Sequence, residues 1–511
     1  MNLNFLKKSN FNIKKAMIYE KAYEKILELQ LFDENFYRKY YKGYFNGDAL
    51  IHYLFEGYKK NFDPSKNFNT EKYLNTYPDV KKGDMNPLAH YALYGINEGR
   101  KIFLSINYMK EEISDKNLQY LHNYKFSNEP LVSIIILNRN GVTHLKRLFN
   151  DFSKKTNYSN FECIIVDNNS DDSSVDYLKS LNVNFPLKII ENDENMSFSK
   201  ANNESCKIAN GEYILLLNND IEPTFGWLNE MMGVMLNNDN VGSVGAKLVF
   251  PYYENKPKQS YKIQHSGDIL SFRKKPYTIY AYNQNKFADP FDSKVNDLKK
   301  VVSVTAAAIL IKKSIYEEVG GLDEGYIYGY EDVDFSLKLN QRGYDIWYCP
   351  SALLFHHESS TRNVSLNSDN NYSRLNSKWW NYLNRNIFID KIDNNKFFCE
   401  KPLNFLFIVK DINEIPEIAL KLAEKLKDES YIVDFNVNSD NIKINGAVDV
   451  IISFTSNLNE NIDIRDNTVK ILFLENEEIE NDYYDIIIHD DANFMKVFKD
   501  YIYLKYGENE A

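Results

Sequence analysis

Short apolar runs alternate with amphipathic stretches through the middle of the chain. The runs read LVSIIIL, FECIIVD, LKII, GEYILLLN and AAAILI. Their length and their content of Ile, Val and Leu are typical of buried strands, and the stretches between them have helical spacing. This alternation predicts an α/β layer over residues 130–375, followed by an aromatic helical connector over residues 376–400.

The first part of the chain, residues 1–105, has a different pattern that occurs twice. Residues 32–64 align with residues 68–102, and His52 matches His90 at an offset of 38. Each unit contains an aromatic helical segment, a turn and a second helical segment that ends at a glycine. The repeat predicts two stacked helical hairpins. A histidine repeated inside an apolar pattern indicates packing more than a ligand site.

The alternation of apolar runs starts again after residue 401. The runs LNFLFIV, YIVDFNV, VDVIISF, VKILFLE and YDIIIHD surround the helical stretch EIPEIALKLAEKLK. We therefore expect a Rossmann-like parallel α/β domain over residues 401–511. It has no GxGxxG or GxxxxGK[ST] loop, so a structural or docking role is favoured over a second catalytic one. A degenerate half of a second transferase stays an alternative.

Composition and charge narrow the classes of function. The chain has 511 residues, of which 43% are hydrophobic and 26% charged, as expected of a globular protein with about three domains. Its net charge of −11 argues against general nucleic-acid binding. Because no apolar run approaches the length of a membrane span, the expected location is cytoplasmic. Peripheral membrane contact through Lys7, Lys8, Lys14 and Lys15 is a less favoured alternative.

Ionisable side chains follow several of the predicted strands. Asp220 ends the NND that follows YILLL, and His356 follows the apolar strand SALLF. The next residue, His357, is expected to point to the other face of the sheet. Glu331 and Asp332 precede a helical pattern, where Asp334 is expected to be an ordinary first-turn charge. Open α/β sheets bind ligands at the carboxyl ends of their strands, so these residues suit a divalent cation and a proton acceptor. Each alone also fits a turn or a helix start.

The ordered set of segments resembles the family 2 glycosyltransferases of the GT-A fold. The matching segments are VSIIILNRNG, IIVDNNSDDSS, NMSFSKANNES, NND, YGYEDVDFSLKLNQRG and FHHESST. They most resemble bacterial rhamnosyltransferases and related cell-surface glycan transferases. The chain departs from the family pattern at Asn218, which replaces the first acid of the DxD motif, and at Ser197 and Glu204, which replace glycines.

The resemblance implies an inverting hexosyl- or deoxyhexosyltransferase of bacterial surface polysaccharide biosynthesis. Such an enzyme moves a sugar from a nucleoside-diphosphate sugar to a glycan or lipid-linked acceptor. By this resemblance Asp220 and His356 hold Mn²⁺ or Mg²⁺, and Asp332 is the catalytic base. The residues implied in binding the nucleotide sugar are Asn138, Asn140, Asp167, Asn202, Asn219 and Glu331.

Two other classes of function remain as alternatives. A nucleotidyltransferase that makes sugar nucleotides would share the α/β architecture, but it needs a glycine-rich basic phosphate loop. The segment LNRNG holds one glycine. A non-enzymatic glycan-binding or scaffold protein would need no metal-binding residues at the strand ends.

Overall fold

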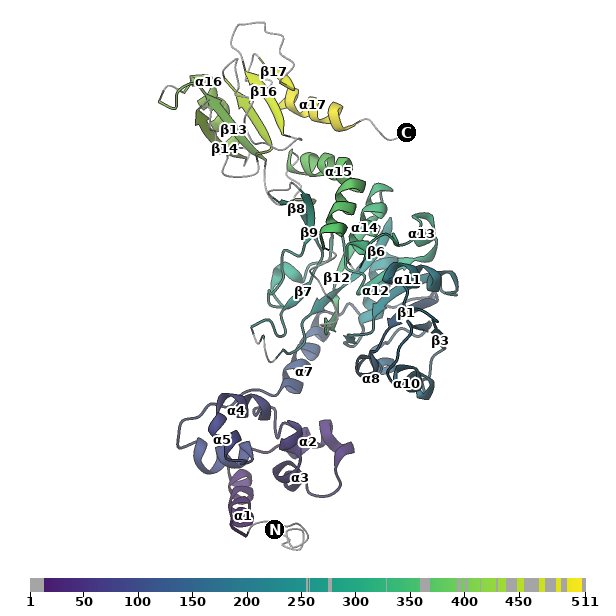
Figure 1. Ribbon diagram of the computed structural model, residues 1–511, viewed down its shortest axis with the longest axis vertical. Helices are drawn as coiled ribbons and strands as arrows, with labels where there is room; N and C mark the ends of the chain where they lie inside the picture. Colours follow the sequence, from purple (N-terminus) through teal and green to yellow (C-terminus); the bar gives the residue numbers. More distant parts are fainter. Residues whose placement is uncertain are drawn as a thin grey trace. The chain divides into compact units, whose positions relative to one another are not determined.

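The computed structural model forms two compact units, Met1–Tyr120 and Leu121–Ala511 (Figure 1). Among the residues that it describes, no helix is long and apolar enough to cross a membrane. Lys7 and Lys8 lie outside the described residues. The described ranges are 13–253, 256, 258–273, 278–327, 329–358, 368–392, 397–399, 403–413, 415–428, 431–437, 448–454, 468–473, 484–488 and 494–507.

The first unit consists of helices, four of which start after a polar residue that caps them. Carboxylate or amide oxygens accept backbone N–H groups at four of the starts, which satisfies donors that a helix leaves open. These caps are Asp33, Asp48, Asn69 and Asn86. The helices are α1 (Ile13–Glu28), α2 (Glu34–Tyr41), α3 (Ala49–Phe55), α4 (Thr70–Thr76), α5 (Pro78–Lys82), α6 (Pro87–His90) and α7 (Ile106–Asn117).

The two repeats share a tyrosine–histidine contact, which is partly buried in the first repeat and buried in the second. The Tyr37 hydroxyl lies 2.8 Å from His52 Nδ1, and Tyr73 lies 3.2 Å from His90 Nδ1. Burial lowers the pKa of both histidines, so they are neutral packing groups, as the repeat predicts. A Cβ atom at Gly57 would overlap the Tyr37 hydroxyl, and the matching glycine of the second repeat is placed likewise. The repeated glycines are therefore needed for this close approach as well as for ending a helix.

A ten-stranded sheet forms the centre of the second unit. Its order is β10-β12-β6-β11-β4-β1-β2-β3, with β5 paired to β12 and β7 paired to β6. Each of the five apolar runs forms a strand, as predicted. The strands are β1 (Val132–Asn138), β2 (Phe161–Asp167), β3 (Leu187–Glu191), β4 (Tyr213–Asn218), β5 (Ile221–Pro223), β6 (Val241–Val249), β7 (Ile263–His265), β10 (Lys299–Lys300), β11 (Ala308–Lys312) and β12 (Asp345–His356).

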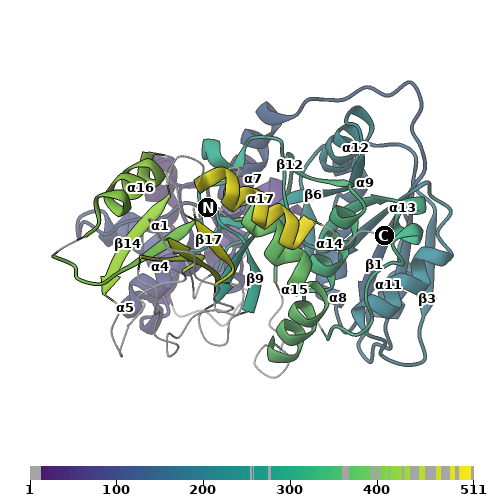
Figure 2. The ribbon, with the colours of Figure 1, turned by 90° about the horizontal axis from the view of Figure 1, so that it is seen from above.

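Helices bury both faces of this sheet. In β1, Ile134 and Ile136 pack into one core while Ile135 packs into the other, because successive side chains point to opposite faces. The helix α12 (Trp227–Asn237) packs on the first face and α14 (Glu331–Gln341) on the second (Figure 2). The sheet is thus fixed from both sides, and the ends of its strands are free to carry a site.

The described C-terminal strands form a separate parallel sheet of order β14-β13-β15-β16-β17. This agrees with the expected Rossmann-like fold. The domain boundaries at residues 105, 130, 375 and 400 stay predictions. The elements are α15 (Ser368–Ile392), β13 (Asn404–Val409), α16 (Glu417–Asp428), β14 (Ile432–Val437), β15 (Val450–Ser453), β16 (Val469–Phe473), β17 (Ile486–Ile488) and α17 (Phe494–Gly507).

Candidate active site

A cavity of about 410 Å³ lies at the ends of β4, β7 and β12 and at the start of α14. Its position fits the rule that ligands bind at the carboxyl edge of an open α/β sheet. It brings together His356 and Asp332, which are 24 positions apart in the sequence. Its polar lining includes Gln264, His265, Asp268, Glu331, Asp332 and His356.

Asp220 and His356 form a close pair beside this cavity. The strand β12 runs antiparallel to β5 with His356 opposite Ile221, which brings His356 next to Asp220. His356 Nε2 lies 3.2 Å from Asp220 Oδ1, and both residues are buried. His356 is part of the cavity wall, whereas Asp220 is not among the residues that line it.

The two facing atoms of this pair, an imidazole nitrogen and a carboxylate oxygen, are suitable ligands for a divalent cation. Gln264 Oε1 lies 2.7 Å from His356 Nδ1, so it accepts the Nδ1 proton and leaves Nε2 to face Asp220. Two ligands at right angles, each about 2.1 Å from the ion, lie about 3 Å apart, close to the observed separation. The described residues contain no cluster of three or more His, Cys, Asp or Glu suited to a metal. A cation here would complete its shell with phosphate oxygens and water.

His357 points away from this pair, as alternation along the strand predicts. Its Nε2 lies 3.3 Å from Glu222 Oε2, and its backbone N–H donates to the carbonyl of Asp220. The two adjacent histidines therefore meet different carboxylates, on opposite faces of the sheet.

The two adjacent acids at the start of α14 have different surroundings. Glu331 is buried and its Oε2 accepts the backbone N–H of Gly329 at 2.6 Å. Asp332 is only partly buried, lines the cavity, and its Oδ2 accepts the N–H of Ala306 at 3.2 Å. Both acids line the cavity, but Glu331 is buried and satisfies the backbone at the helix start, whereas Asp332 is the more exposed of the two.

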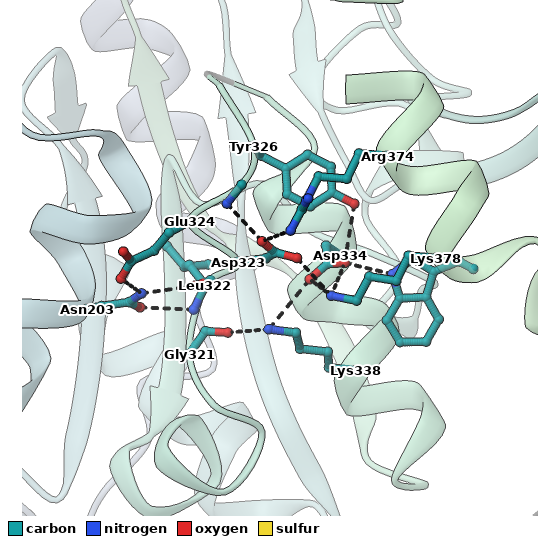
Figure 3. Close-up of polar contacts among 12 residues, drawn as sticks. Asn203, Gly321, Leu322, Asp323, Glu324, Tyr326, Asp334, Lys338, Arg374 and Lys378 are labelled. Carbon is teal, nitrogen blue, oxygen red and sulfur yellow. Dashed lines mark hydrogen bonds and ion pairs between the residues drawn. The ribbon is translucent and has the colours of Figure 1, made fainter. Parts of the chain in front are cut away.

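Asp334 is not the ordinary first-turn charge that its position at the start of α14 indicates. Its side chain is fully buried and accepts from Trp379 Nε1 at 2.7 Å, Lys378 Nζ at 3.0 Å and Tyr326 Oη at 3.3 Å (Figure 3). Both Trp379 and Lys378 belong to α15. A buried carboxylate with these donors ties α15 to the first turn of the helix that carries Asp332.

The same network holds the loop that precedes α14. Asp323 accepts from Arg374 at 2.7 Å and from Lys378 at 3.0 Å (Figure 3). From the other side, Asn203 of α11 (Phe198–Lys207) donates to the carbonyl of Leu322 and accepts its N–H. The loop is therefore fixed between α11 and α15.

Asn202, the neighbour of Asn203, is placed differently. It is buried, and its side-chain amide donates to the carbonyl of Phe198 within α11 at 2.9 Å. The structure does not bring it into the wall of the cavity. A role for Asn202 toward the donor stays a prediction.

The remaining predicted residues lie at the ends of β1, β2 and β4. Asn138 donates to Asp167 Oδ1 at 3.0 Å and accepts from Asn219 Nδ2 at 2.8 Å. The backbone N–H of Asn140 donates to Ser170 Oγ, which in turn donates to Asp167. These contacts join the three strand ends into one polar network, with Asn140 exposed and Asn138 and Asp167 buried.

Sequence reasoning missed three residues of the segment IQHSGD. Gln264 fixes the tautomer of His356, and His265 and Asp268 line the cavity. Burial lowers the pKa of His265 to about 4, opposed by the charge of Asp332. Burial, followed by the charge of Asp332, raises the pKa of Asp268 to about 7. The only signal in the sequence is a concentration of polar side chains around a glycine.

The comparisons with known proteins agree with this architecture. Residues 133–319 match the family model described as Glycosyl transferase family 2. This part of the chain is therefore similar to the family 2 glycosyltransferases, and its fold is the GT-A fold.

Two curated relatives match about half of the chain but little of their own length. The O-antigen biosynthesis protein RfbC of Myxococcus xanthus is 29% identical over 256 residues, which is 49% of this chain and 19% of the relative. The uncharacterized protein y4gI of Sinorhizobium fredii is 30% identical over 46% of this chain and 25% of its own length. A solved structure of GalNAc-T7 with UDP, GalNAc and Mn²⁺ matches 50% of this chain and 49% of its own, with 17% identity and a TM-score of 0.40.

The burial of Asp334 leads to a prediction about stability. Asp334→Ala leaves the Trp379 indole and the Lys378 ammonium without their buried acceptor. We expect it to lower the free energy of unfolding by about 3 kcal/mol, roughly 5–10 °C in melting temperature. Calorimetric melting of the full chain measures this.

The matched control is Glu204→Ala, which removes a carboxylate from the exposed pair with Lys207. It should change the melting temperature little. Equal melting temperatures for Asp334→Ala and Glu204→Ala would contradict the anchoring role of Asp334.

Proposed function

We propose that the protein is an inverting glycosyltransferase of bacterial surface polysaccharide biosynthesis. It transfers a hexosyl or deoxyhexosyl group from a nucleoside-diphosphate sugar to a glycan or lipid-linked acceptor. The observation that carries the proposal is that one cavity is lined both by a carboxylate in the position of a base, Asp332, and by His356, whose partner Asp220 completes a pair suited to a cation. The match to the family 2 model and the name of the relative RfbC also support it.

The proposed chemistry assigns Asp332 to the acceptor. Its carboxylate takes the proton of the acceptor hydroxyl as that oxygen attacks the anomeric carbon. The bond from that carbon to the diphosphate breaks on the opposite side, which inverts the configuration. Asp220 and His356 would hold Mg²⁺ or Mn²⁺, and such a cation, when bound, neutralises charge on the leaving diphosphate.

The nucleotide end of the site belongs to the polar network of the first strands. Asn138 and Asp167 shape this end and fix each other, while the exposed Asn140 and the neighbouring Asn219 lie at its edge. We assign base and ribose recognition to these four residues. Glu331 and Asn202 complete the proposed donor site, and they act through the α14 and α11 backbones that they hold.

A non-enzymatic glycan-binding scaffold is the second candidate. It would bind sugars without a nucleotide and without a metal requirement. Calorimetric titration with UDP, dTDP and GDP, each with and without Mn²⁺, separates the two. Metal-dependent nucleotide binding supports the transferase, whereas its absence for all three nucleotides contradicts it.

The first prediction concerns the metal pair. Asp220→Ala should abolish metal-dependent nucleotide binding because it removes the charged ligand, and His356→Ala should weaken it by about 10–100-fold. His357→Ala is the matched control, since its imidazole faces Glu222 instead. The same titrations measure all three variants. Wild-type affinity in Asp220→Ala would exclude this carboxylate as a ligand.

The second prediction concerns the base. Asp332→Asn keeps the shape of the side chain and removes its basicity, so nucleotide affinity should persist. The turnover of the sugar nucleotide should fall by roughly 10²–10⁴. Steady-state kinetics with the best donor of a sugar-nucleotide panel measures this. Glu331→Gln is the comparison, and a dead Glu331→Gln beside an active Asp332→Asn would mean that the wrong acid is assigned.

A further inference from the structure

One short segment of backbone holds three ionisable side chains of the cavity. Within residues 303–306, the Ser303 hydroxyl donates to Asp268 Oδ2 at 3.1 Å. The backbone N–H of Thr305 donates to His265 Nε2 and that of Ala306 donates to Asp332 Oδ2, both at 3.2 Å. Asp268 also pairs with Ser303 through its backbone. The relative positions of Asp268 and Asp332 are therefore set by a single rigid segment.

The histidine of this group is a support and not a second base. Because His265 Nε2 accepts a backbone N–H, its proton lies on Nδ1, on the side of Asp268. His265 is buried, and its low pKa keeps it neutral at physiological pH. Neither nitrogen is left to take a proton from a substrate.

Asp268 differs from His265 because its carboxyl group can still form a hydrogen bond to a ligand. Its side chain is 14% exposed and lines the cavity, and Oδ1 lies 3.7 Å from His265 Nδ1, beyond hydrogen-bond distance. Its charged neighbour is Asp332, and Lys286 and His356 face the adjacent His265. With a pKa near 7, about half of the Asp268 carboxyl groups are neutral at neutral pH and can donate a hydrogen bond.

The surroundings place Asp268 on the acceptor side of the cavity. Its electrostatic partner is Asp332, the proposed base, which lines the same cavity and is held by the same backbone segment. A sugar presents hydroxyls on adjacent carbons, so a ligand whose one hydroxyl meets Asp332 can offer the next one to Asp268. A neutral Asp268 also avoids a second negative charge beside the base.

We propose that Asp268 binds the acceptor sugar at the hydroxyl adjacent to the one that Asp332 deprotonates. The acceptor is then a sugar with two free neighbouring hydroxyls, and Asp268 determines specificity for it. This rests on the proposed glycosyltransferase function.

The test uses the full-length protein, Mn²⁺, its best sugar nucleotide, and a panel of p-nitrophenyl glycosides as acceptor probes. Asp268→Ala should raise the KM for an accepted glycoside by about 10–100-fold, the worth of one good hydrogen bond. Nucleotide affinity and hydrolysis of the donor by water should stay within about 3-fold. Asp268→Asn keeps a donor and should restore most of the acceptor affinity. The exposed Asp239→Ala is the matched control.

Two further readouts distinguish hydroxyl binding from a merely structural role. A monodeoxy glycoside that lacks the adjacent hydroxyl should bind wild type and Asp268→Ala equally weakly. In the wild type the acceptor KM should rise as the pH passes 7 and the carboxyl loses its proton, and Asp268→Asn should lose this dependence.

Several results would overturn the proposal while the transferase function stands. One is an unchanged acceptor KM in Asp268→Ala, and another is an equal penalty for the deoxy glycoside in both proteins. A third is weaker nucleotide binding or slower hydrolysis by water, which would place Asp268 on the donor side. If Asp268→Ala fails to fold, Asp268→Leu, which is similar in size to aspartate and has no hydrogen-bonding group, carries the same expectations. Failure of the wild type to bind any nucleotide with Mn²⁺ would instead overturn the proposed function itself.

Discussion

The antiparallel pairing of β12 with β5 is the contact on which the site depends. It brings Asp220 and His356 within 3.2 Å although 135 residues lie between them in the sequence. The strand β7 adds Gln264, whose carbonyl fixes the imidazole in the form that presents Nε2. A carboxylate and an imidazole buried together in this way are held by three strands, so the sheet itself defines the proposed cation site.

The part of the cavity wall that α14 supplies depends on buried charge in place of strand pairing. Asp334, fully buried, is stabilised by donors from α15, and the acid-rich loop before α14 is held between α11 and α15. A buried carboxylate is costly unless hydrogen-bonded donors and a cation satisfy it, so this arrangement tolerates little change. It fixes the first turn of α14, and with it the position of Asp332.

The sequence predicted the sheet well because apolar runs and their alternation are local signals. The end of the apolar run SALLF identified His356, and the acids before a helical pattern identified Asp332; the structure brings both to one cavity. The function of Asp334 could not be predicted, because its partners Lys378 and Trp379 come from a helix more than forty residues further on. The strand β7 is only three residues long and gives no periodic signal, and Asp268 lies just after it. The sequence therefore did not predict that Gln264 and Asp268 belong to the site.

The central claim is that Asp220 and His356 together hold the divalent cation. Anomalous diffraction from crystals of the protein grown with Mn²⁺ and the nucleoside diphosphate that binds best tests it directly. The account predicts one Mn²⁺ peak about 2.2 Å from a carboxylate oxygen of Asp220 and from Nε2 of His356, with the diphosphate on its other side. A Mn²⁺ ion bound to the diphosphate but out of reach of both side chains would contradict it.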